Sequence, residues 1–228
     1  MRQGFLRPLA CALAGLAAAA ACGRAPAEPV RAGEPAARAA SRTTIVFLGD
    51  SLTAGYGLSA SEAYPSLLEA RLRSAGLAVD VVNAGVSGDT SAGGVRRLDW
   101  ALEGDVKVLV VALGGNDALR GLSTEELRRN LGAIIERARQ RNVTVILAGM
   151  EAPPNLGRAY TSAFRQVYRD LAAAHRIALI PFLLDGVAGK PALNQADFIH
   201  PNAAGAAKVA DLLWPYVERA VREAGNDD

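Results

Sequence analysis

Five short, continuous apolar runs alternate along this chain with longer amphipathic segments, and this alternation constrains the fold more than any other feature. The runs are rich in Val, Ile and Leu, which is typical of strands buried on both faces. They span residues 44–48, 79–83, 106–113, 143–148 and 178–181. The amphipathic segments predict helices at residues 62–75, 93–102, 124–141, 159–176 and 203–223. This order predicts an α/β fold, a three-layer α/β/α sandwich around a five-stranded parallel sheet.

Local signals indicate where several helices begin, end or bend. Ser123 stands three residues before Glu126, the spacing of a capping box in which each side chain bonds the backbone of the other residue. Gly76 follows the helix expected at residues 62–75 and suits the left-handed conformation that often terminates a helix. Pro215 falls inside the last helix and is expected to kink or restart it.

The first 42 residues are expected to lie outside the folded domain, which we place at residues 43–228. Arg2 and Arg7 precede an alanine-rich apolar run ending in small residues, which predicts an export signal peptide at residues 1–21. Cys22 then resembles the lipidated cysteine of bacterial lipoproteins, which would anchor the protein on a periplasmic membrane surface. Plain cleavage, giving a soluble periplasmic or secreted protein, is the alternative. Residues 22–42 are expected to form a flexible tether.

Both cysteines of the chain, Cys11 and Cys22, precede the expected domain. The domain therefore has no disulfide, no thiol nucleophile and no cysteine metal site. The formal net charge is only +2, and no clustered basic face is visible, so we expect no nucleic-acid partner. The sequence leaves the oligomeric state open.

Small and polar residues gather in the loops that follow the predicted strands. The carboxyl ends of parallel strands meet at one edge of the sheet, where open α/β sheets place their ligands. Ser51, in Gly49-Asp50-Ser51-Leu52 after the first strand, is the candidate nucleophile. Because Asp and Ser are also common helix caps, the Gly-Asp-Ser tripeptide taken alone favours a helix cap over a nucleophile.

Only two histidines could serve as a base for Ser51. His175 stands at the end of a predicted helix, where a cation is favourable, and is expected at the surface. His200 follows Asp197 by three residues, so the carboxylate could orient the imidazole Nδ1 and leave Nε2 for the serine proton. Turn and cap chemistry before Pro201 explains Asp197 and His200 equally well when they are considered alone.

Ester hydrolysis also needs donors for a developing oxyanion. The candidates are the backbone amides of Ser51 and Gly88 and the side-chain amide of Asn116, although glycine and asparagine are also ordinary turn residues. Three further polar residues are expected to support the loops from behind: Asp50, Asn83 and Asp117.

The blocks Gly49-Asp50-Ser51-Leu52, the Gly88 loop, Gly115-Asn116-Asp117 and Asp197-x-x-His200 resemble, in order, those of the SGNH, or GDSL, hydrolase superfamily. The residues around them resemble its thioesterase I / lysophospholipase L1 / arylesterase branch, over about residues 44–221. The resemblance implies a flavodoxin-like SGNH fold that needs no metal or organic cofactor. It implies that Ser51 is the nucleophile, with His200 as the base and Asp197 orienting it. It assigns the oxyanion hole to Ser51, Gly88 and Asn116.

The segment Pro154, Asn155, Leu156 and Gly157 stands where this branch has a mobile loop over the acyl groove. A flexible glycine and an apolar leucine would suit a flap that closes on an alkyl chain. An ordinary loop before a helix is the alternative.

The resemblance predicts a serine ester hydrolase that forms an acyl-enzyme on short- to medium-chain carboxylic esters, acyl thioesters or lysophospholipids. Export would favour lysolipids or exogenous esters over cytosolic acyl-CoA. A carbohydrate O-acetylesterase would use the same residues, and a non-catalytic ligand-binding lipoprotein is the alternative from another class.

Overall fold

The structure, a computed structural model, describes residues 42–225. The signal peptide expected at residues 1–21 and the lipidation site Cys22 lie outside the described residues, as does the expected tether except for Arg42. Within the described residues, no helix is both long enough and apolar enough to cross a membrane.

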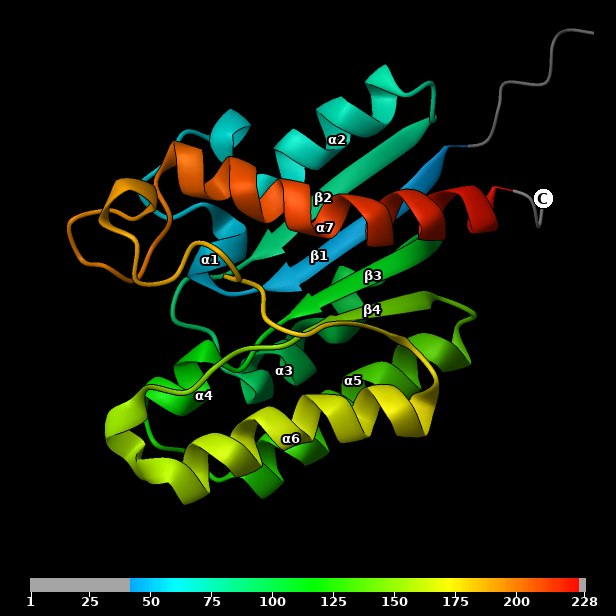
Figure 1. Ribbon diagram of the computed structural model, residues 1–228. Coiled ribbons are helices and arrows are strands. Elements are labelled where there is room, and N and C mark those ends of the chain that lie inside the picture. Colours follow the sequence, from blue (N-terminus) through cyan, green and yellow to red (C-terminus); the bar gives the residue numbers. More distant parts are fainter. Residues whose placement is uncertain (1–41, 226–228) are drawn as a thin grey trace, which may run out of the picture. The chain divides into compact units, whose positions relative to one another are not determined.

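The centre of the fold is a parallel sheet of five strands in the order β2-β1-β3-β4-β5 (Figure 1). The strands are β1 (Thr43–Gly49), β2 (Val79–Gly85), β3 (Val106–Ala112), β4 (Thr144–Ala148) and β5 (Ala178–Ile180). All five predicted strands are thus confirmed. Gly49 at the end of β1 pairs with Gly85 on one side and Ala112 on the other. The three loops that follow these strands therefore start at the same level of the sheet.

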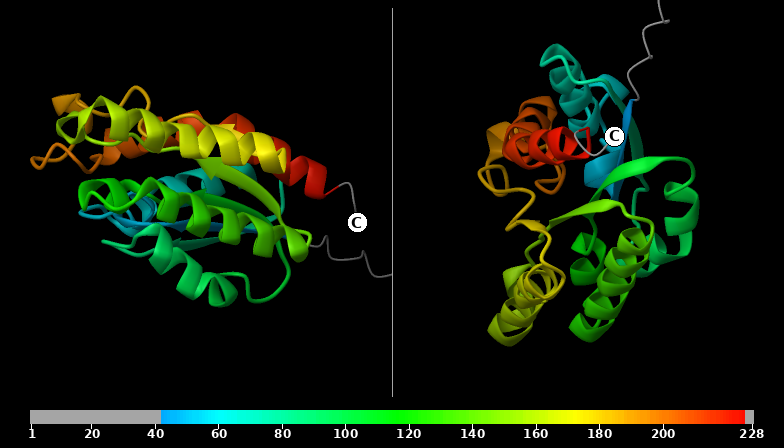
Figure 2. Two further views of the ribbon diagram at one scale, coloured as in Figure 1. Left: turned by 90° about the horizontal axis from the view of Figure 1, so that it is seen from below. Right: turned by 90° about the vertical axis from the view of Figure 1, so that its right-hand side faces the viewer.

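In the described part of the chain, seven α-helices and three short 3₁₀ segments connect and cover the strands. The α-helices are α1 (Ser51–Ala54), α2 (Tyr64–Ser74), α3 (Ser91–Ala101), α4 (Gly115–Leu119), α5 (Thr124–Gln140), α6 (Gly157–His175) and α7 (Ala203–Ala224). The 3₁₀ segments are Ala60–Glu62, Pro154–Leu156 and Pro191–Leu193. Helices α2 and α7 pack together on one face of the sheet, and α3, α5 and α6 pack on the other (Figures 1 and 2). The expected three-layer sandwich is confirmed.

The core lies between the three central strands and these two helix layers. Residues 45–48 of β1 and 108–111 of β3 are at most 1% exposed. Each fully buried aliphatic side chain contributes about 1.5–3 kcal/mol relative to exposure, so this sheet is the main source of stability. The apolar core holds the carboxyl ends of β1 and β3 rigidly, and the candidate site is built on those ends.

Of the local predictions for helix ends and bends, one is confirmed and two are wrong. Gly76 has a φ of 79° after α2, as expected for a helix terminator. The capping box at Ser123 is wrong, because Ser123 exchanges its hydrogen bonds with Glu125 and not with Glu126. A restart at Pro215 is also wrong, since α7 continues through it. Pro215 is exposed, so water can reach the carbonyl group that lacks its N–H partner.

Candidate active site

Ser51 is presented by a tight turn from β1 into α1. A Cβ atom on Gly49 would lie 1.9 Å from Thr53 Oγ1 and 3.0 Å from the carbonyl oxygen of Ala112, so only glycine allows this close approach. Asp50 caps α1, because its Oδ1 accepts the N–H of Leu52 at 3.0 Å. Capping therefore belongs to Asp50, and the hydroxyl of Ser51 stands at the carboxyl end of β1.

The loop between β5 and α7 brings a histidine to this hydroxyl. His200 Nε2 lies 2.9 Å from Ser51 Oγ, although the two residues are 149 positions apart. Its Nδ1 lies 2.6 Å from Asp197 Oδ2. The other oxygen of Asp197 accepts the backbone N–H groups of Ile199 at 2.9 Å and His200 at 3.0 Å. Serine, histidine and aspartate thus form one continuous chain of hydrogen bonds.

Hydrogen bonds keep Asp197 ionised. The backbone N–H of His200, its ring and the N–H of Ile199 all stabilise the carboxylate, which lowers the pKa of Asp197 to about 2. The side chain of His200 is 18% exposed, and the Tyr56 ring lies 4.6 Å from the imidazole, centroid to centroid. The imidazole is therefore held from one side by the carboxylate and covered by an aromatic ring.

Gln195 fastens the loop that carries His200. Its side-chain Nε2 donates to the carbonyl oxygens of Tyr56 at 2.7 Å and Pro201 at 2.9 Å. Its backbone N–H donates to the carbonyl of His200 at 2.8 Å. Our sequence analysis missed Gln195, because no motif marks a side chain that bonds a backbone 139 residues away.

The three candidate oxyanion donors lie near one another at the strand ends. Gly88 has a φ of 80°, a conformation that favours glycine, and Arg120 Nη2 donates to its carbonyl at 2.7 Å. Asn116 Nδ2 donates to the carbonyl of Asp89 at 3.0 Å and to Asp50 Oδ2 at 3.3 Å. Ser51, Gly88 and Asn116 all line the same groove.

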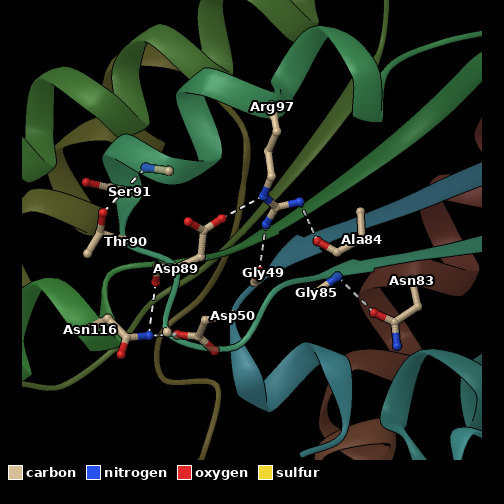
Figure 3. Close-up of polar contacts among 12 residues, drawn as sticks. Gly49, Asp50, Asn83, Ala84, Gly85, Asp89, Thr90, Ser91, Arg97 and Asn116 are labelled. Carbon is tan, nitrogen blue, oxygen red and sulfur yellow. Dashed lines mark hydrogen bonds and ion pairs between the residues drawn. The ribbon is translucent and has the colours of Figure 1, made fainter.

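An ion pair behind the groove joins the loops together (Figure 3). Arg97 Nε lies 2.6 Å from Asp89 Oδ2, and both side chains are largely buried. The same guanidinium donates to the carbonyls of Ala84 at 2.6 Å and Gly49 at 2.7 Å. Arg97 of α3 therefore ties together the ends of β1 and β2 and the loop carrying Asp89, whose carbonyl accepts the amide of Asn116. The sequence analysis missed this pair: Asp89 lies in the Gly88 loop, but Arg97 follows eight positions later inside a predicted helix, where no motif marks it.

Each of the three supporting residues has a distinct place. Asp50 is buried beside the site, and this burial raises its pKa to about 6, although Leu52, the charge of His200 and Asn116 oppose the shift. Asp117 is a buried residue of α4, and its carboxylate accepts both the N–H and the hydroxyl of Ser91. Asn83 donates to the Thr53 carbonyl and accepts the N–H of Gly85, so it joins β2 to α1 without lining the groove.

Ser51 and His200 lie on the wall of a groove with a volume of about 700 Å³. Most of its lining is apolar: Leu52, Tyr56, Leu119, Met150, Ala152, Pro153, Pro154, Phe182, Leu184, Ala188, Phe198 and Ile199. Of the segment expected to form a flap, Pro154 lines the groove, whereas Asn155, Leu156 and Gly157 do not. The preceding residues from Met150 to Pro153, in the loop that the sequence places after the fourth strand at this edge of the sheet, also line the groove.

His175 is separate from this arrangement. It ends α6, where its ring lines a different depression at the amino ends of β4 and β5. Among residues 42–225, no three His, Cys, Asp or Glu side chains are placed to bind one metal ion.

Comparison with known proteins places this geometry in a family. Residues 47–208 match the GDSL-like Lipase/Acylhydrolase family. This match covers more than half of the chain and includes every residue of the hydrogen-bonded chain described above. The chain belongs to the GDSL-like lipase/acylhydrolase family. It is a carboxylic ester hydrolase of the SGNH type.

Curated relatives and a solved structure agree with this membership. Esterase TesA of Pseudomonas aeruginosa is 43% identical over 177 residues, which cover 77% of this GDSL hydrolase and 88% of the relative. The thioesterase 1/protease 1/lysophospholipase L1 of Escherichia coli K12 is 40% identical over 177 residues, covering 77% of this chain and 84% of that protein. The crystal structure of TesA matches with a TM-score of 0.75 at 41% identity, covering 78% of this chain and 99% of that one.

Proposed function

We propose that this GDSL hydrolase cleaves short- to medium-chain carboxylic esters through an acyl-enzyme on Ser51. The observation that carries the proposal is the pair of contacts made by His200. Its Nε2 lies 2.9 Å from Ser51 Oγ, and its Nδ1 lies 2.6 Å from Asp197 Oδ2. These distances are within the range in which a base can take the proton of a nucleophile.

The reaction then proceeds in two halves. Ser51 Oγ attacks the ester carbonyl while its proton passes to His200 Nε2, and the carboxylate of Asp197 stabilises the imidazolium. His200 returns the proton to the leaving alcohol or thiol as the carbonyl–leaving-group bond breaks, which leaves the acyl group on Ser51. Water attacks this acyl-enzyme with His200 again as the base, and the acid product and free Ser51 result.

The proposed oxyanion hole uses the backbone N–H groups of Ser51 and Gly88 and the side chain of Asn116. In the described structure the side-chain amide of Asn116 donates one hydrogen bond to the carbonyl of Asp89 and one to Asp50 Oδ2. The contact with Asp50 is the longer of the two, at 3.3 Å, and we propose that it yields to the oxyanion. The contact with Asp89 then keeps the amide aimed at the groove.

The groove supports an apolar substrate. Its volume of about 700 Å³ falls in the range that holds a small ligand, and its walls are mainly apolar. We therefore propose alkyl-chain esters, acyl thioesters and lysophospholipids as the substrate class, in keeping with the names of the two curated relatives. A carbohydrate O-acetate would leave most of the apolar wall uncovered.

Replacing the proposed nucleophile tests the mechanism. Ser51→Ala should lower kcat on p-nitrophenyl butyrate by about 10⁴-fold or more, because no hydroxyl remains to be acylated. A fluorophosphonate should label wild type at Ser51 and leave the variant unlabelled. Ser74→Ala, at an exposed serine of α2, is the matched control and should behave as wild type. Equal rates in wild type and Ser51→Ala would overturn the proposal.

An acyl-chain panel tests the substrate class. For p-nitrophenyl esters from acetate to laurate, kcat/KM should rise from acetate to a maximum at a medium chain, since each added methylene buries apolar surface in the groove. Activity that is confined to acetyl esters, together with release of acetate from acetylated carbohydrate, would favour the O-acetylesterase instead.

We also propose that the protein is exported and anchored through Cys22. The support is the apolar, small-residue segment that ends at Cys22. Mass spectrometry of the mature amino-terminus should find a lipidated cysteine, whereas an unmodified Cys22 or a terminus elsewhere would refute the anchor.

A further inference from the structure

Phe198 lies between Asp197 and His200 in a backbone conformation that L-amino acids rarely adopt. Its φ is 58°, where a bulky side chain is crowded by its own backbone. Among residues 42–225, the other non-glycine residues with a positive φ are Asn142 and Arg176. Both stand just after a helix, where a left-handed residue is a common terminator. Phe198 ends no helix, so its presence there needs another explanation.

The turn itself does not require a phenylalanine. The N–H of Phe198 donates to the carbonyl of Gln195 at 3.0 Å, and the next two N–H groups donate to Asp197 Oδ1. These backbone bonds orient Asp197 and His200 whatever side chain stands at position 198. Glycine would adopt the same φ without strain. The ring is therefore present at a conformational cost that the turn does not explain.

Packing in the core does not explain the ring either. The Phe198 side chain is 61% exposed, so little burial offsets its strained backbone. Seven large apolar residues are exposed in the described part of the chain, and four of them line the groove: Tyr56, Leu119, Phe198 and Ile199. An exposed ring on the wall of the groove is available to whatever the groove binds.

We propose that Phe198 is a specificity-determining residue whose ring packs against the alkyl chain of the ester in the groove. This inference rests on the function proposed above and goes further by naming the residue that selects for chain length. The ring gains contact only when the substrate carries a chain long enough to cover it. It therefore raises kcat/KM for long-chain esters and leaves short-chain esters almost unchanged.

Phe198→Gly tests this inference, because glycine preserves the strained turn. For p-nitrophenyl octanoate kcat/KM should fall about 10-fold, the scale of a few apolar contacts in a pocket, mainly through KM. For p-nitrophenyl acetate it should stay within about 2-fold of wild type. A second series, octyl acetate against ethyl acetate, distinguishes an alkyl chain on the alcohol side from one on the acyl side. A selective loss in either series supports the proposal and identifies the side.

Two control variants test whether the effect is specific to the apolar ring at position 198. Phe198→Leu keeps an apolar side chain and should retain most of the selectivity. Trp100→Ala removes an exposed ring of α3 that does not line the groove, and it should change neither series. Unchanged chain-length ratios in Phe198→Gly, or equal losses on short and long esters, would overturn the inference while the proposed hydrolysis stood. Failure of the wild type itself on every ester would instead refute the proposed function.

Discussion

Asp50 is a buried carboxyl group beside the groove whose ionisation is opposed by its surroundings. It caps α1 beside the nucleophile and is only 2% exposed, so its ionised form is desolvated. Burial raises its pKa to about 6, whereas the charge of His200 favours the carboxylate. The same buried charge that destabilises the fold therefore lies close enough to stabilise an imidazolium on His200.

The shifted pKa of Asp50 predicts a pH-dependent stability. Its ordinary pKa of 3.8 applies to the unfolded chain and about 6 to the folded one, so the folded state binds the proton more tightly. Below the lower value both states are protonated and nothing is lost. Above about pH 6 the group is ionised in both states. The difference between the two pKa values then corresponds to a loss of about 3 kcal/mol in the free energy of unfolding. Wild type should therefore lose stability relative to Asp50→Asn as the pH rises from 4 to 8.

Urea unfolding of wild type and Asp50→Asn at pH 4 and pH 8 measures this difference. The asparagine also changes the hydrogen bond with Asn116, which favours the ionised carboxylate, so the pH-dependent part of that effect is already contained in the shifted pKa. The variant should also have a lower kcat at pH 8, because it lacks the charge beside His200. A difference in unfolding free energy that is the same at both pH values would contradict the shifted pKa.

At the scale of elements, α3 aligns the loops that meet at the site. Its Arg97 pairs with Asp89 and donates to the carbonyls of Gly49, the last residue of β1, and Ala84, the residue before the last of β2 (Figure 3). Asp89 in turn accepts the amide of Asn116 through its backbone carbonyl. One guanidinium thus couples the position of a helix to two strand ends and to a proposed oxyanion donor.

Replacing Arg97 should reduce both stability and catalysis. Arg97→Met leaves the largely buried Asp89 without its partner, which should cost about 3 kcal/mol of unfolding free energy. Loss of alignment should also lower kcat by roughly 10- to 100-fold with a smaller effect on KM, because misplacement penalises the transition state. Denaturant unfolding and steady-state kinetics measure the two effects.

Arg137→Met is the matched control for Arg97→Met. It breaks an ion pair with the exposed Asp99, which should cost less than about 1 kcal/mol and leave kcat unchanged. Adding Asp89→Asn to Arg97→Met removes the unpaired charge and should recover part of the stability. If Arg97→Met loses stability while kcat is unchanged, the arginine only stabilises the fold.

At the scale of the whole molecule, one buried sheet supports every part of the site. Ser51, Gly88 and Asn116 each follow one of the three strands β1, β2 and β3, which lie side by side. His200 comes from the loop after β5, at the far edge of the sheet. The geometry of the site therefore depends on the register of four strands and the helices that hold them.

A core substitution should separate stability from chemistry. Leu109 is fully buried on β3 between Val46 and Val145, so Leu109→Ala should cost about 2–5 kcal/mol and lower Tm by roughly 5–20 °C. The kcat of the folded enzyme should stay near that of wild type, because the strand ends keep their register. Val82→Ala, on the exposed side of edge strand β2, should change Tm little. A large loss of kcat in folded Leu109→Ala would show that core packing tunes the site.

The sequence by itself determined the elements and their order. Apolar runs and amphipathic periodicity are local properties, and they predicted five strands and the long helices between them. The short helices α1 and α4 were not predicted, because four or five residues are too few to show a helical periodicity. The proximity of Asp197 and His200 was also predictable, since three positions in one turn keep two side chains close.

Only the tertiary structure decided which distant residues meet. The motif blocks predicted that His200 serves Ser51, but the 2.9 Å distance between them comes from the fold. The ties made by Arg97 and Gln195 and the groove wall at Phe198 also join segments that are separate in sequence. Such contacts depend on how strands pair and how helices pack, and no local pattern encodes these distances. The positive φ of Phe198 was likewise not predictable from residue preference, since glycine is the residue that favours this conformation. It accompanies the hydrogen bonds within the turn, which only the structure shows.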